Sequence, residues 1–132
     1  MNPQLFARGV LWITGGAFFL IGIAYVLAPA AILPSMSLAA VSPAGLSDVR
    51  AFYGGGEIGL GLGFLLASRY EPLLRPALWL GVLSLGFMAA GRIFGMLVDS
   101  EPNLYLWAML ALEIPGVALN AVGLWLTGVR DR

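Results

Sequence analysis

The sequence predicts an all-α integral membrane protein, and three observations lead to that class. Of the 132 residues, 60% are hydrophobic and only 11% are charged, whereas a soluble domain carries about 25% charged residues. The apolar residues fall into four blocks, each close to the roughly 20 residues that a helix needs to cross a bilayer. The connections after the second and third blocks are short. We therefore expect one four-helix bundle over residues 1–132, with consecutive helices antiparallel.

The four expected spans cover approximately residues 9–28, 49–67, 77–98 and 104–128. The first follows Arg8 and ends at Pro29, and its length exceeds the roughly 7 to 15 apolar residues of a signal peptide. The second is expected to begin at Ser47 or Asp48, since either side chain can cap a helix N-terminus. Between these spans, the Pro- and Ser-containing residues 30–47 indicate the one sizeable loop.

Two tight turns are expected to join the remaining spans. The first combines Arg69-Tyr70-Glu71-Pro72 with Arg75-Pro76, and the second covers Asp99 to Asn103. Arginine is retained on the cytoplasmic side of a membrane. One side of the predicted bundle collects Arg8, Arg69, Arg75, Arg130 and Arg132, whereas the other has only Arg50. This asymmetry predicts that both termini are cytoplasmic.

The composition excludes several classes of function. Lys and Arg together balance Asp and Glu at seven each, so no basic field is available to hold nucleic acid. The chain has no Cys and no His, which removes thiolate and imidazole chemistry and most zinc or copper sites. No cofactor and no metal are therefore expected. Enzyme action is the least supported class, because no pairing of a nucleophile with a base is visible.

Three of the spans carry a charged residue at a similar depth. Glu57, Arg92 and Glu113 each lie roughly 10 to 14 Å below one end of their predicted helices, at a rise of about 1.5 Å per residue. A lone charge near the middle of a bilayer is disfavoured by about 2.5 to 3.5 kcal/mol. The three groups should therefore face inward, with Arg92 bridging both carboxylates.

Helical spacing extends this cluster along the helices. Seven residues make about two turns, which predicts Arg50 above Glu57, with Tyr53 between them, and Asp99 above Arg92. Asn120 follows Glu113 on the same face, and Tyr25 could donate its hydroxyl. The candidate site residues are Arg50, Tyr53, Glu57, Arg92, Asp99, Glu113 and Asn120.

Two interpretations of the cluster stay open. It is either a structural network that fixes helix order, or a polar pocket or proton path that opens to the outer side. Two carboxylates beside one guanidinium would favour a proton on one of them, which is the hint of proton chemistry.

Small residues form a second pattern. Gly55, Gly59 and Gly63 recur every four residues on the second span. Gly91 and Gly95 make a shorter stripe on the third. Such stripes let another helix approach closely. We expect them to serve packing within the bundle, with a dimer face as the alternative.

The run from Asp48 to Gly55, followed by Gly59-Leu60-Gly61, resembles the opening motif of the domain-of-unknown-function family 4345. Gly91-Arg92, Gly95, Asp99 and Glu113 resemble the rest of the family's signature. The resemblance covers nearly the whole chain. It implies a small bacterial four-helix protein of the inner membrane, distantly similar to DoxX-like bundles, and no known activity.

The leading functional hypothesis is an outward-facing polar pocket that binds a small molecule or lipid headgroup. Arg50 and Arg92 would contact an anion, with Glu57 and Glu113 as their partners. One alternative is an accessory subunit that binds partner helices or a second copy through the glycine stripe. The other is a proton-linked transport component. The expected surroundings are the lipid bilayer.

Overall fold

The computed structural model describes residues 2–39, 42–99 and 103–128, which are almost entirely helical. The elements are α1 (Pro3–Leu27), α2 (Pro29–Ile32), the 3₁₀ turn η1 (Leu33–Met36), α3 (Pro43–Val49), the π-helical segment η2 (Arg50–Gly55), α4 (Gly56–Ala67), α5 (Glu71–Val98) and α6 (Leu104–Gly128). Three of them, α1, α5 and α6, are long and apolar enough to cross a membrane. The chain is therefore a membrane protein built from helices, as its composition predicts.

Helix α1 begins at Pro3, earlier than the predicted start of the first span near residue 9. The Asn2 side chain accepts a hydrogen bond from the backbone N–H of Gln4, and Pro3 occupies the first helical position. Both are favourable helix-start signals. The helix ends at Leu27, and Ala28 is its C-cap residue, after which Pro29 opens α2.

The second apolar block is helical without a break from residue 43 to residue 67, through α3, η2 and α4. Its expected start at Ser47 or Asp48 is wrong. Ser42 Oγ accepts a hydrogen bond of 3.1 Å from the N–H of Gly45, and Pro43 is the first helical residue. The predicted loop is shorter as a result, and α2 and η1 fill its first part. Residues 40–41 of that loop lie outside the described residues.

A π-helical segment interrupts this run at Arg50–Gly55. In a π-helix each backbone N–H bonds to the carbonyl five residues earlier, so a turn takes more residues than in an α-helix. Seven residues across η2 therefore no longer make two turns. This register shift separates the directions of Arg50 and Glu57, which α-helical spacing had placed on one face.

The turn between α4 and α5 is also tighter than expected. It occupies only Ser68 to Tyr70, and Arg75-Pro76 lie inside α5 instead of in the turn. Glu71 and Pro72 stand at the first helical positions, where an acidic side chain and a proline are both favourable. Pro76 comes one turn later and is tolerated within the helix. The predicted boundaries of α6 agree with the structure, whereas residues 100–102 of the preceding turn lie outside the described part.

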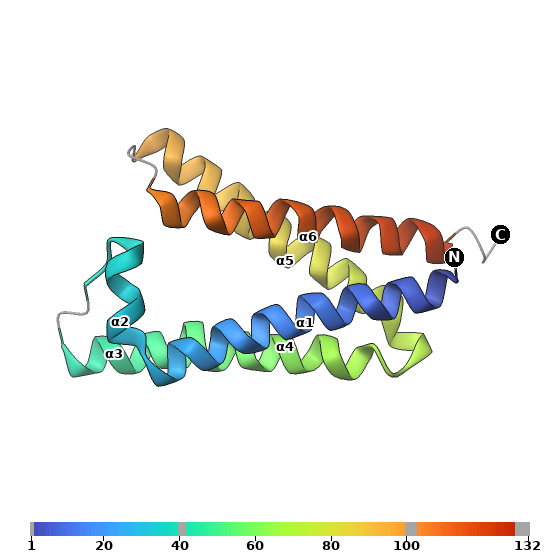
Figure 1. The fold of residues 1–132 in the computed structure, drawn as a ribbon, viewed down its shortest axis with the longest axis horizontal. Coiled ribbons are helices and arrows are strands. Elements are labelled where there is room, and N and C mark those ends of the chain that lie inside the picture. Colours follow the sequence, from blue (N-terminus) through green and yellow to red (C-terminus); the bar gives the residue numbers. More distant parts are fainter. Residues whose placement is uncertain (1, 40–41, 100–102, 129–132) are drawn as a thin grey trace.

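Helix α1 lies at the centre of the arrangement, because it packs against α4, η2, α5 and α6. Figure 1 shows α1 beside α4, and α5 beside α6, with the two pairs close together where α1 begins and α6 ends. We call this the terminal end. The pairs diverge toward the opposite end, where α2 projects (Figure 1), and we call that the loop end.

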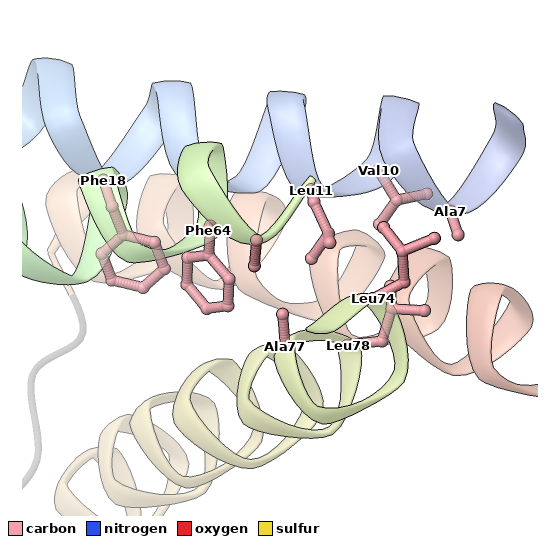
Figure 2. Close-up of a cluster of buried hydrophobic side chains, with 9 residues drawn as sticks. Ala7, Val10, Leu11, Phe18, Phe64, Leu74, Ala77 and Leu78 are labelled. Atoms are coloured by element: carbon pink, nitrogen blue, oxygen red, sulfur yellow. The ribbon is translucent and has the colours of Figure 1, made fainter. Parts of the chain in front are cut away.

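A buried hydrophobic cluster closes the terminal end. Figure 2 shows side chains of α1, α4 and α5 meeting there. The cluster consists of Ala7, Val10, Leu11, Phe18, Phe64, Ala67, Leu74, Ala77 and Leu78. Polar contacts hold the helix ends around it: Arg8 Nη1 donates to the carbonyl of Ser68 at 2.7 Å, and Gln4 Nε2 donates to Glu71 Oε1. Arg75 Nη1 donates to Thr127 Oγ1 at 3.3 Å, which ties α5 to α6.

Glycines allow a close helix contact between α1 and the η2–α4 run. A Cβ placed on Gly61 would lie 2.6 Å from the backbone nitrogen of Phe19 and 2.7 Å from the carbonyl oxygen of Gly15. A Cβ on Gly22 would lie 2.7 Å from the carbonyl oxygen of Gly54. These positions leave no room for a side chain, so the two backbones touch directly.

The predicted packing stripes are not the residues that make this contact. A Cβ on Gly59, Gly63 or Gly91 would meet nothing within 4 Å. A Cβ on Gly55 would meet only the carbonyl oxygen of Arg50, at 3.9 Å, and one on Gly95 only a side-chain oxygen of Asp99, at 3.8 Å. The expectation that both stripes pack against helices of the same chain is therefore wrong. The face of α4 that touches α1 is the one that carries Gly61.

Candidate functional site

The centre of the polar cluster is an ion pair between α5 and α6. Arg92 Nε donates to Glu113 Oε1 at 2.8 Å. The Glu113 side chain is only 7% exposed, and that of Arg92 is 24% exposed. The guanidinium therefore compensates a carboxylate that has almost no access to solvent, and the predicted pairing of Arg92 with Glu113 is present.

Glu57 lies near this pair but does not complete the predicted bridge. It is within electrostatic range of Arg92, yet Arg92 to Glu113 is the one ion pair found in the described parts of the chain. Glu57 Oε2 is buried and has no hydrogen-bond partner there. The expectation that Arg92 bridges both carboxylates is correct for Glu113 and wrong for Glu57, which belongs to α4 on the other side of the divergence.

Three tyrosines form a connected group that reaches the ion pair through Tyr105. The hydroxyls of Tyr25 and Tyr105 share a hydrogen bond of 3.2 Å, and Tyr25 also donates to the Met36 sulfur at 3.0 Å. The Arg92 guanidinium carbon lies 5.6 Å from the centre of the Tyr105 ring, within the range of a cation–π contact. The Tyr53 ring lies 5.5 Å from that of Tyr25. These contacts link α1, η2, α5 and α6.

Tyr105 belongs to this group but is absent from the candidate residues predicted from the sequence. A signal for it exists, since Tyr105 precedes Glu113 by eight residues, or about two helical turns on a similar face. The Tyr25 hydroxyl was expected to join the cluster, and it does so through Tyr105.

Two predicted members do not join the cluster. Arg50 Nε donates to the backbone carbonyl of Val26 at 3.1 Å, so this guanidinium caps the end of α1. The π-helical segment that begins at Arg50 is the physical reason. Asp99 is exposed at the end of α5, where its backbone N–H bonds to the Gly95 carbonyl, and it makes no ion pair with Arg92. The predicted ladder of alternating charges is therefore absent from the described residues.

Asn120 forms a second polar contact nearer the middle of the helices. Its side chain is fully buried, and its Nδ2 donates to Thr14 Oγ1 at 3.1 Å and to the Gly116 carbonyl at 2.9 Å. Gly81 makes room for it, since a Cβ there would lie 2.4 Å from Asn120 Oδ1. Asn120 therefore joins α6 to α1 and α5. Thr14 is the partner that the sequence did not identify.

Among the described residues, three buried side-chain acceptor atoms have no hydrogen-bond partner. They are Glu57 Oε2, Glu113 Oε2 and Asn120 Oδ1. Buried polar atoms in proteins are nearly always hydrogen-bonded, and the exceptions point to strain, function or an additional bound group. The described residues hold no group of three or more acidic, His or Cys side chains that could bind a metal ion. The free oxygens can accept hydrogen bonds from water or from a bound molecule.

A separate groove lies at the loop end and is chemically different. It has a volume of about 250 Å³ and is lined by Ala30, Leu33, Pro34, Leu38, Ala39 and Leu46. All of these side chains are apolar, so the groove does not belong to the polar cluster.

One of the comparisons with known proteins identifies a family for this chain. A family model described as a domain of unknown function, DUF4345, matches residues 6–126. That range includes both carboxylates of the cluster, Arg92 and the three tyrosines of the connected group. No curated protein and no solved structure matches the chain. Because the family model covers most of its length, the chain belongs to the DUF4345 family of domains of unknown function.

Proposed function

We propose that this chain is a multi-pass protein of the bacterial inner membrane that binds a small molecule or a lipid headgroup in its polar cluster. The observation that carries this proposal is the pair of buried carboxylate oxygens, one on Glu57 and one on Glu113, that have no partner. A purely structural network would gain from pairing both, because an unpaired buried acceptor costs about 1 to 3 kcal/mol. A ligand with hydrogen-bond donors would satisfy them.

The position of the cluster supports access for such a ligand. The helix pairs diverge toward the end where α5 leads into α6 (Figure 1), and Arg92 lies in the last two turns of α5. Helix α4 does not pack extensively against α6. Glu57 and Arg92 are each partly exposed, and Tyr53 is 41% exposed. The buried hydrophobic cluster closes the opposite end. A site that opens toward the loop end therefore fits this chain better than a continuous polar path for transport.

We further propose four membrane spans with both termini in the cytoplasm. The helical run 43–67 is 25 residues long by its numbering and consists mostly of apolar residues, so it has the length to cross a bilayer beside α1, at about 1.5 Å rise per residue. The arginine asymmetry orients the bundle, and the loop end would then face outward.

This topology has a direct test. A reporter enzyme fused after Arg132 should behave as cytoplasmic, and the same reporter inserted near Ser42 should behave as periplasmic. A matched insertion next to Arg69, in the turn between α4 and α5, should again behave as cytoplasmic. The reverse pattern would overturn the orientation. Equal behaviour of the reporters near Ser42 and next to Arg69, which flank the helical run 43–67, would overturn the span count.

The ligand itself can be sought by native mass spectrometry of the protein extracted from its membrane. We expect the wild type to carry a bound small molecule or lipid that Glu57→Gln loses. Glu57 is the better residue to change, because Glu113 is needed by Arg92 for the fold. Asp48→Asn is the matched control, since Asp48 is exposed on α3 and the substitution removes the same charge. A wild type without any bound molecule, or one whose bound molecule survives Glu57→Gln, would contradict the proposal.

A second candidate function is the association with a partner helix or a second copy through α4. The observation that favours it is the open space beside Gly59 and Gly63, both of which face away from α1. An outward stripe of small residues permits the close approach of another membrane helix. Loss of an oligomer in Gly59→Leu, with the protomer still folded, would support this function.

A further inference from the structure

The charges of the cluster indicate the sign of the ligand that it would bind. This inference rests on the proposed function. Two carboxylates, Glu57 and Glu113, face one guanidinium, Arg92, which pairs with Glu113. The other cation predicted for the cluster, Arg50, donates to the backbone carbonyl of Val26. With both acids ionised, the cluster has one negative charge that no described residue compensates. A negative ligand would add to this charge, whereas a positive one would neutralise it.

The free carboxylate oxygens of the cluster also favour a positively charged ligand. An ionised carboxylate is only an acceptor, so Glu57 Oε2 and Glu113 Oε2 both require donors. The Glu113 side chain is more than nine-tenths buried, so solvent does not readily supply the donor. A protonated amine carries up to three N–H donors and a positive charge, and such charge-assisted hydrogen bonds are among the strongest in proteins.

The aromatic residues around the cluster are also suited to a cation. Tyr53 packs against Tyr25, whose hydroxyl bonds to that of Tyr105, and Tyr105 already lies against the Arg92 guanidinium. The faces of aromatic rings carry partial negative charge and attract organic cations. Three rings from α1, η2 and α6 therefore form one connected group, which reaches the Arg92–Glu113 ion pair through Tyr105.

We propose that the site binds a protonated primary amine, held by the free carboxylate oxygens of Glu57 and Glu113 and bordered by Tyr25, Tyr53 and Tyr105. Such an amine is found in free small molecules and in the ethanolamine headgroup of membrane lipids. This differs from the expectation of an anion bound by Arg50 and Arg92, because in the structure one of these guanidiniums is committed to a carboxylate and the other to a backbone carbonyl.

The test compares three probes of the same shape and different charge on the full chain in nanodiscs of phosphatidylglycerol, which has no amine. We expect n-butylammonium, at about ten times its dissociation constant, to raise the thermal unfolding temperature by roughly 3 °C or more. n-Butanol and butyrate at the same concentration and ionic strength should not. A second arm replaces part of the lipid with phosphatidylethanolamine. If this lipid raises the thermal unfolding temperature and n-butylammonium then raises it no further, the headgroup is the source of the amine.

Variants assign the effect to the cluster. The stabilisation by n-butylammonium should disappear in Glu57→Gln and persist in Asp48→Asn. Tyr53→Leu, which removes a partly exposed ring, should weaken it and serves as the second variant if Glu57→Gln does not fold. Stabilisation by butyrate, no stabilisation by either source of amine, or an amine effect that survives both Glu57→Gln and Tyr53→Leu would overturn the inference. A neutral or anionic molecule that is found by mass spectrometry and lost in Glu57→Gln would leave the proposed ligand site standing and remove the amine.

Discussion

Gly61→Leu should destabilise the protein by roughly 3 kcal/mol, the upper end of the usual range for overpacking. The reason is that even a single carbon at this position would overlap the backbone of α1, at the nitrogen of Phe19 and the carbonyl of Gly15. Backbone atoms cannot rotate away as a flexible side chain can. The two helices must therefore move apart, and the contacts between Phe18 and Phe64 in the buried cluster would loosen with them.

Gly59→Leu and Gly63→Leu are matched controls on the same helix. A Cβ at either position meets nothing within 4 Å, and replacing a glycine in a helix removes a penalty of about 1 kcal/mol. Reversible unfolding in mixed detergent micelles would measure all three variants. We expect both controls to keep the stability of the wild-type protomer, whatever they do to oligomers. A loss in Gly59→Leu equal to that in Gly61→Leu would show that α4 packs on α1 through a different face.

The contrast among these glycines shows how far the sequence determines the fold. Hydropathy predicts the number and approximate positions of the apolar blocks, because each needs a similar length to cross a bilayer. The small-residue pattern indicates close helix contact but does not say which face makes it. Gly54 and Gly61 face α1, whereas Gly55, Gly59 and Gly63 do not. The choice depends on the partner glycines Gly15 and Gly22 of α1, and no local pattern connects the two helices.

The sequence predicts those contacts of the site that depend on how deep a residue lies in its helix. It does not predict those that depend on the helical face on which the residue lies. Arg92 and Glu113 lie at similar distances from a shared connection, and their pairing follows from the cost of a lone charge in lipid. Arg50 was misplaced because η2 has a different number of residues per turn, and apolar periodicity does not reveal a π-helical segment in a helix that is apolar all round. The role of Tyr105 escaped for another reason, since aromatic residues near helix ends are expected at any membrane interface.

Arg92→Ala should be the most damaging change in the polar cluster, with an expected cost of about 3 to 5 kcal/mol in the free energy of unfolding. The substitution removes the one hydrogen-bond partner that the Glu113 carboxylate, 7% exposed, has among the described residues. It also leaves Glu57 without its neighbouring positive charge and removes the cation that lies over the Tyr105 ring. The loss therefore comes mainly from stranded buried acids and less from the ion pair itself.

Two further variants separate that cause from a general loss of packing. Arg92→Ala combined with Glu113→Gln should recover part of the stability, because the stranded charge is gone, and a double-mutant cycle measures the recovery. Arg69→Ala is the matched control, since Arg69 is exposed in the turn between α4 and α5 and exposed charges contribute about 0 to 1 kcal/mol. A double variant that is no more stable than Arg92→Ala alone would mean that the guanidinium acts by filling space over Tyr105. In that case Arg92→Met, which keeps much of the side-chain length without the charge, should be more stable than Arg92→Ala, whereas adding Glu113→Gln to Arg92→Ala should give no gain.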